Sequence, residues 1–106
     1  KDVIKSGGEW ISTIEIENIA VAHPKILEAA VVGVLHHKWD ERPLLIIVAK
    51  EEIAKKEVFA YLEDKIAKWW MPDDILFLND LPHTATGKVR KVELKKKYKT
   101  YLTSKD

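Results

Sequence analysis

The loop at residues 81–90, Leu-Pro-His-Thr-Ala-Thr-Gly-Lys-Val-Arg, carries the residues best suited to chemistry in this chain of 106 residues. Gly87 allows a sharp bend and a close approach of the backbone to a ligand. The hydroxyls of Thr84 and Thr86 can hold such a turn through local hydrogen bonds. Lys88 then presents a compact positive charge that suits a phosphate or a carboxylate. The loop therefore predicts an anion-binding lysine.

This loop does not match the phosphate-binding loop of the P-loop nucleotide hydrolases. That motif needs a glycine five residues before Gly87, where Pro82 stands. It also needs a serine or threonine directly after Lys88, where Val89 stands. The alternative for Lys88 is an ordinary solvated lysine in a basic segment.

A second candidate site lies near the N-terminus, at Ser6-Gly7-Gly8. The paired glycines predict a hairpin turn, because glycine adopts positive φ angles readily. Their bare backbone would also let a thin group pass close by. Lys5 and Trp10 flank the turn. Lys5 offers a charge to a ligand, whereas Trp10 is either a core residue or an exposed aromatic of the hairpin.

The periodicity of the chain predicts the elements that must position these two loops. Ser12 and Glu15 form a capping box that opens a helix, and Pro24 ends it near His23. Continuous apolar runs indicate strands, and amphipathic stripes indicate helices. The expected elements are a hairpin at 3–11, strands at 29–34, 44–49 and 75–78, helices at 12–23 and 55–69, and a last helix with Val92 or Leu94 in its stripe.

We therefore predict an α+β fold: a small two-layer domain with a short, mostly antiparallel three-stranded sheet, flanking helices and an N-terminal β-hairpin. A chain of this length forms one domain, and its 46% apolar and 33% charged residues are typical of a globular protein. No apolar run approaches the roughly 20 residues of a spanning helix. No segment resembles a signal peptide, so we expect a cytoplasmic location and no membrane span.

Metal and nucleic-acid sites are not expected. The chain has no cysteine, and the adjacent His36 and His37 point apart in an extended strand. The net charge is +1, although seven basic residues against Glu93 give +6 between residues 88 and 99. This uneven charge favours a local anionic partner. A basic nucleic-acid-binding module remains an alternative, disfavoured by the low net charge and the lack of a stacking motif.

The loop around Lys88 resembles the C-terminal signature of the adenylate-forming enzymes, which include acyl-CoA synthetases, nonribosomal adenylation domains and beetle luciferases. The matching residues are Pro82, Thr84, Thr86, Gly87, Lys88, Arg90 and Leu94. Residues 2–12 are similar to the family's hairpin motif after the interdomain hinge. Residues 37–43, His-Lys-Trp-Asp-Glu-Arg-Pro, are similar to a loop that usually reads Trp-Gly-Glu-Arg-Pro in fatty-acyl-CoA synthetases.

The resemblance implies that residues 1–106 are the mobile C-terminal domain of an ATP-dependent acyl-CoA synthetase, beginning at the interdomain hinge with Lys1. A larger N-terminal domain, absent here, would bind ATP with its Mg²⁺ and the fatty acid. Lys88 would be catalytic, because it would contact the carboxylate and the α-phosphate during adenylation. The hairpin would then enter the active site for thioester formation with CoA. The cofactor-binding residues implied are Lys5, Gly7, Gly8 and Trp10.

Two alternatives and one departure from the family pattern stay open at this point. A nonribosomal adenylation domain usually has a hairpin like Val-Lys-Ile-Arg-Gly-x-Arg-Ile, so residues 4–10 fit the CoA ligases better. A stand-alone interaction domain is the other alternative. Asp40 replaces the family's usual glycine, and aspartate tolerates left-handed geometry better than most residues. Trp39 and Arg42 are expected to shape a loop at the domain surface.

Overall fold

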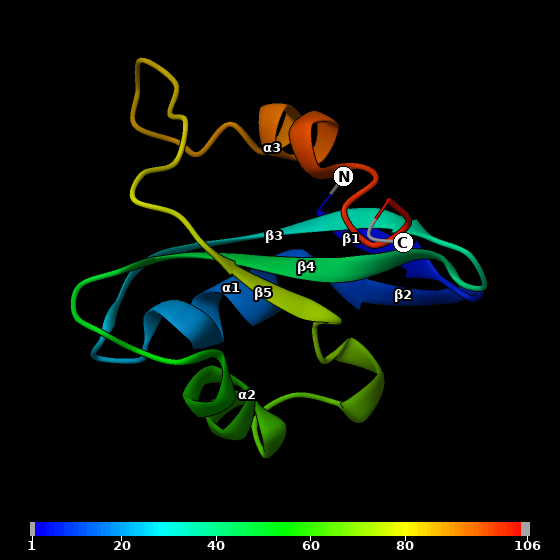
Figure 1. The fold of residues 1–106 in the computed structure, drawn as a ribbon, viewed down its shortest axis with the longest axis horizontal. Helices are drawn as coiled ribbons and strands as arrows, with labels where there is room; N and C mark the ends of the chain where they lie inside the picture. Colours follow the sequence, from blue (N-terminus) through cyan, green and yellow to red (C-terminus); the bar gives the residue numbers. More distant parts are fainter. Residues whose placement is uncertain (1, 105–106) are drawn as a thin grey trace.

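The structure is a computed structural model in which residues 2–104 are described (Figure 1). Lys1, the expected hinge residue, lies outside this part. The N-terminal hairpin consists of β1 (Val3–Ser6) and β2 (Glu9–Ser12). The elements that follow are α1 (Thr13–Val21), β3 (Ile26–His36), β4 (Asp40–Ala49), α2 (Lys55–Glu63), the 3-10 turn η1 (Lys68–Trp70), β5 (Asp74–Phe77) and α3 (Lys91–Tyr98).

One sheet of five strands organises the domain. The long strands β3 and β4 run antiparallel, from Ile26 opposite Ala49 to His36 opposite Asp40, with one shift of register between Ile26 and Glu28. β5 pairs with β4 in parallel, and the hairpin joins through β1, where Ser6 pairs with Asp40. The predicted α+β class is therefore confirmed. The three expected strands and the hairpin are parts of a single, mostly antiparallel sheet.

Apolar side chains cover both faces of this sheet. In β3 and β4, Val31 and Leu45 belong to the core under α1 and α2, whereas Val32 and Leu44 belong to the core under α3. Figure 1 shows the same arrangement, with α1 and α2 on one side of the strands and α3 on the other. The prediction of two layers therefore needs a correction. The continuous apolar runs in the sequence supply a second buried face, which α3 covers as a third layer.

The helix boundaries follow the predicted caps, except in α2. The Ser12 hydroxyl accepts the Glu15 backbone N–H at 3.2 Å, as the capping box predicts. α2 ends at Glu63, so the predicted extension to Trp69 is wrong. Trp69 still packs against the core, but from the short turn η1. Apolar residues at helical spacing can thus reach a core without a continuous helix.

The end of the chain is tied back to β5 through Asp74. Tyr101 Oη donates to Asp74 Oδ2 at 2.8 Å, and Lys55 Nζ donates to Asp74 Oδ1 at 3.0 Å. Burial by itself raises the pKa of Asp74. The hydrogen bonds from Tyr101, from the Ile75 backbone N–H and from Lys55 outweigh it and lower that pKa from 3.8 to about 2. Burial, together with the hydrogen bond to the charged Asp74, raises the pKa of Tyr101 to about 12.

We expect the free energy of unfolding to fall as the pH drops from about 4 to about 2. A carboxyl whose pKa is lower in the folded than in the unfolded state stabilises the fold only above the unfolded value, and this contribution is lost as pH falls through the folded value. Urea unfolding across this range should show a smaller pH dependence for Asp74→Asn than for the wild type. An unchanged slope in the variant would contradict the assignment.

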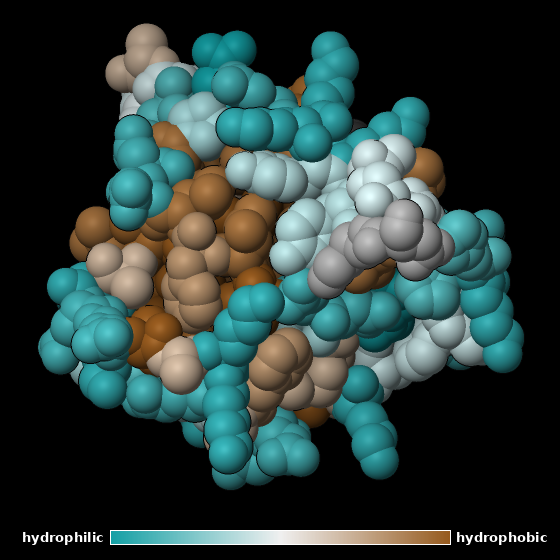
Figure 2. Space-filling view, in the orientation of Figure 1, coloured by the Kyte–Doolittle hydropathy of each residue, from teal (hydrophilic) through white to brown (hydrophobic). Residues whose placement is uncertain are grey.

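The face in Figure 2 is not evenly covered. On the left of this view, apolar side chains gather below the segment that leads from β5 to α3. Polar side chains surround this apolar area. A hollow at the C-terminal ends of β4 and β5 is lined by apolar residues, among them Val48 and Phe77, and by the polar residues Glu51, Glu52 and Asn79. Within residues 2–104, no helix is long and apolar enough to cross a membrane.

Candidate functional site

The loop that carries Lys88 is a small hairpin closed by its own hydrogen bonds. Thr84 donates its backbone N–H to the Lys88 carbonyl at 2.7 Å, and Gly87 donates to the Thr84 carbonyl at 2.9 Å. Lys88 in turn donates its backbone N–H to Thr84 Oγ1 at 3.2 Å. Gly87 has φ = +88°, a conformation that favours glycine. The loop is thus held in one shape although it is exposed.

The Lys88 side chain is exposed and makes no ion pair or hydrogen bond with a residue in the described range 2–104. Its basic neighbours differ in this respect. Arg90 pairs with Glu93 at 3.3 Å, and Lys91 pairs with Glu17 at 2.8 Å. The fold therefore neutralises the charges beside Lys88 and leaves the Lys88 ammonium open to an anion from outside the domain.

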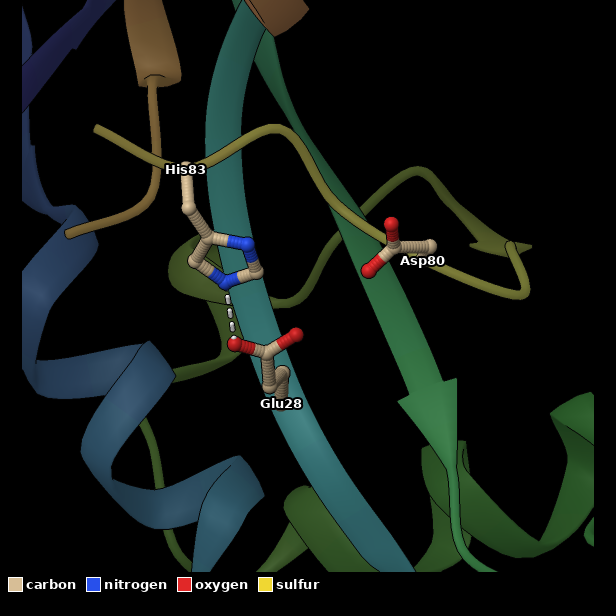
Figure 3. A group of neighbouring side chains, drawn as sticks. All are labelled: Glu28, Asp80 and His83. Atoms are coloured by element: carbon tan, nitrogen blue, oxygen red, sulfur yellow. Dashed lines mark hydrogen bonds and ion pairs between the residues drawn. The ribbon is translucent and has the colours of Figure 1, made fainter. Parts of the chain in front are cut away.

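The base of the Lys88 loop is attached to β3 (Figure 3). His83 Nε2 lies 2.6 Å from Glu28 Oε2. Asp80 lies nearby, and one ligand atom from each of the three residues falls within 4.8 Å of the others. Imidazole and carboxylate are donor types that bind divalent cations. Because Glu28 and His83 are already partners, the contact is first of all a hydrogen bond that holds the loop on the sheet.

The turn of the N-terminal hairpin uses its two glycines for different reasons. Gly7 has φ = +55° and Gly8 has φ = +88°. A Cβ atom added at Gly7 would lie 2.8 Å from Cε3 of Trp39, whereas one added at Gly8 would meet no atom within 4 Å. Gly7 thus faces the domain and Gly8 faces outward.

We expect Gly7→Ala to destabilise the domain more than Gly8→Ala. Both substitutions place a side chain at positive φ, which costs about 1–2 kcal/mol. Gly7→Ala also forces a methyl group against the Trp39 ring, and overpacking of this kind costs about 1–3 kcal/mol more. Urea unfolding of both variants measures the difference. Equal losses would mean that Trp39 moves away freely.

Lys5 and Trp10 lie beside the turn and are brought together by the hairpin. They are direct cross-strand partners, and Lys5 Nζ lies 5.7 Å from the centroid of the Trp10 ring. Trp10 is 60% exposed, which excludes the alternative of a core residue. The two side chains therefore present a cation and an aromatic surface next to Gly8.

Arg42 is buried, so the expectation of a surface loop residue is wrong. Its exposed fraction is 5%, and its guanidinium lies 4.3 Å from the centroid of the Trp69 ring. A buried guanidinium is tolerated only where its donors are satisfied. Its acceptors are Asp73 Oδ1 at 2.6 Å, Ser6 Oγ at 3.0 Å, the Trp69 carbonyl at 2.9 Å and the Met71 carbonyl at 3.0 Å.

The two candidate sites lie at opposite ends of the sheet. The Lys88 loop is attached to Glu28, near the start of β3, whereas the hairpin turn is attached to the β3–β4 turn through Gly7 N–H and the Trp39 carbonyl. Glu28 and His36 are separated by eight residues of strand, or roughly 26 Å at the usual rise. Figure 1 shows the same separation between the β1–β2 turn, in dark blue, and the yellow loop before α3.

The fold and the site thus define a small α+β domain with two exposed loops. Each loop is built around one or two glycines at positive φ. The family of the AMP-binding enzyme C-terminal domain matches residues 15–88. The chain is 55% identical over 97% of its length to a 3-methylmercaptopropionyl-CoA ligase of Ruegeria lacuscaerulensis, and 54% identical over 92% to a medium-chain-fatty-acid–CoA ligase of Ectopseudomonas oleovorans. The ATP-bound crystal structure of MatB from Rhodopseudomonas palustris superposes with a TM-score of 0.90 at 33% identity, covering 95% of the chain.

The chain belongs to the AMP-binding enzyme C-terminal domain family. It spans about a fifth of the length of the relatives it matches: 20%, 18% and 20% of the three proteins named above. Because the sequence relatives are CoA ligases, neither a nonribosomal adenylation domain nor a nucleic-acid-binding module is favoured.

Proposed function

We propose that this domain serves an ATP-dependent acyl-CoA ligase by presenting its two ends in turn to a larger N-terminal domain. That domain would hold ATP, with its Mg²⁺, and a carboxylic acid of the fatty-acid class. In the first half-reaction the carboxylate attacks the α-phosphate of ATP, which gives an acyl-adenylate and pyrophosphate. In the second half-reaction the CoA thiol displaces AMP. Each half-reaction uses a different loop of this domain.

In the adenylation half-reaction, Lys88 stabilises the negative charge that develops on the α-phosphate. Its ammonium has no partner within residues 2–104, and its loop is held by backbone hydrogen bonds, so the charge is available without rearrangement. A preorganised charge acts most strongly where water is excluded. An enclosing N-terminal domain would provide that exclusion when the loop enters it.

In the thioester-forming half-reaction, the hairpin replaces the lysine loop. Gly8 leaves an open backbone surface past which the pantetheine arm of CoA can run. Lys5 and Trp10 flank it with a cation and an aromatic ring, and they would contact the nucleotide or CoA. The observation that carries the proposal is the position of the two loops at opposite ends of the sheet, since one rigid domain cannot present both to a single site at once.

We expect the isolated chain to fold but to form no acyl-CoA from a fatty acid, ATP and CoA. Both candidate sites are exposed loops, and the substrates would need the enclosing N-terminal domain. An assay of acyl-CoA formation tests this directly, with the full-length ligase as the positive control. Turnover by the chain alone would contradict the proposal.

A further inference from the structure

The hairpin turn is fixed from inside the domain by a group of aromatic and polar residues. Ser6 is fully buried, and its hydroxyl accepts a hydrogen bond from Arg42 Nη1 at 3.0 Å. The next residue, Gly7, packs against the Trp39 ring and donates its N–H to the Trp39 carbonyl at 2.9 Å. The outer side of the turn, at Gly8, is open: a Cβ atom added there meets no atom within 4 Å.

Arg42 connects this turn to a distant part of the chain. Its Nε binds Asp73 at 2.6 Å, and its Nη2 binds the carbonyls of Trp69 and Met71. Trp69 also meets Trp39 edge to face, with the ring centroids 5.2 Å apart. One guanidinium thus joins β1, β4 and the segment between α2 and β5. The planar guanidinium of an arginine, with its several N–H donors, suits such a junction better than the ammonium of a lysine would.

The geometry of the β3–β4 turn supports the same arrangement. Asp40 has φ = +71°, so it keeps the left-handed conformation although it is not a glycine. Asp40 pairs with both His36 and Ser6, and this places Trp39 beneath Gly7. The contacts that Ser6 and Gly7 make with the rest of the domain therefore involve the segment from Trp39 to Arg42.

We propose that Arg42 is a positioning residue for thioester formation: through Ser6 it holds the Gly7–Gly8 turn in the shape that admits the thiol arm. The inference rests on the proposed function, because it assigns Arg42 to the half-reaction that uses the hairpin. Arg42 does not itself face solvent, so it acts only through the turn.

The test uses Ser6→Ala in the full-length ligase, because this variant removes one acceptor and leaves the other contacts of Arg42 in place. Transfer of the acyl group from preformed acyl-adenylate to CoA should slow by about 10- to 100-fold, as expected for a misplaced reacting geometry. Pyrophosphate release should stay near the wild-type rate. Hydrogen exchange at the Gly7 and Gly8 amides should be faster than in the wild type.

Ser12→Ala is the matched control, since Ser12 lies in the same hairpin but caps α1 instead of binding Arg42. It should lower the stability of the helix and leave the ratio of the two half-reactions unchanged. Arg42→Lys keeps the positive charge but loses the planar set of N–H donors. Like Ser6→Ala, it should slow CoA transfer more than pyrophosphate release.

Three results would overturn the inference: equal loss of both half-reactions in Ser6→Ala, the same kinetic profile in Ser12→Ala, or unchanged exchange at the turn. Failure of the proposed function is recognised separately. If Gly8→Leu also leaves thiol transfer intact, the hairpin takes no part in that step. If Gly8→Leu blocks the transfer but Ser6→Ala does not, only the role of Arg42 is wrong.

Discussion

Lys88→Ala in the full-length ligase should slow acyl-adenylate formation by about 10²–10³-fold, while CoA transfer from preformed acyl-adenylate proceeds near the wild-type rate. Loss of one preorganised charge contact to a transition state costs about 3–4 kcal/mol. The ammonium is unpaired within the described part of the chain, so its removal breaks no ion pair that holds the fold together. Pyrophosphate release in a single turnover measures the first step.

The matched control for Lys88→Ala is Lys56→Ala. Lys56 is also exposed, but it lies on α2, across the sheet from α3. This control should leave both half-reactions unchanged. If Lys88→Ala slows both half-reactions equally, Lys88 has a structural role or the two half-reactions do not use separate loops.

Gly8→Leu should give the reverse pattern, with pyrophosphate release retained and acyl-CoA formation lost. The Cβ of a leucine at this position meets no atom of the domain within 4 Å. Its side chain would therefore project out of the domain, where it would block the path of the CoA thiol. The positive φ also introduces strain of about 1–2 kcal/mol. Strain alone would lower Tm and would slow both half-reactions to a similar extent.

Gly87→Leu separates strain from obstruction. Gly87 has the same φ of +88° as Gly8, and a Cβ there also meets nothing within 4 Å. The two variants should therefore lose similar stability in urea unfolding. Selective loss of CoA transfer is expected only for Gly8→Leu. Retained transfer in Gly8→Leu would mean that Gly8 is an ordinary turn residue.

Local features of this domain could be predicted from the sequence because nearby residues determine them. The Ser12 cap, the glycine turns and the left-handed Asp40 each depend on one or two neighbours. The apolar runs at 29–34 and 44–49 correctly predicted strands. They did not show which element covers the second face of the sheet. In the structure α3 covers it, with Leu94 packed against residues of β3 and β4.

Contacts between residues that are far apart in the chain could not be predicted from the sequence in this way. Arg42 binds Asp73 across 31 residues and Ser6 across 36, and His83 binds Glu28 across 55. No spacing rule links such pairs, so Arg42 was expected to shape a surface loop, and the contact of His83 with Glu28 was not predicted. The end of α2 was missed for another reason: Ile66 and Trp69 keep a helical spacing while packing from a turn.

The central claim is that the two ends of one rigid domain enter the same active site in turn, and cysteine labelling tests it most directly. The chain has no cysteine, so Ala85→Cys and Glu9→Cys each add a single thiol, on the Lys88 loop and on the hairpin. Both positions are exposed in the domain. The measurement is the rate of maleimide labelling at each position, in a full-length ligase whose other cysteines have been replaced.

With a non-hydrolysable ATP analogue and the carboxylate, position 85 should be protected and position 9 should react freely. With an acyl-adenylate analogue and a CoA thioether, the protection should reverse. Protection of both positions in the same state, or of neither in any state, would contradict alternation of the two ends.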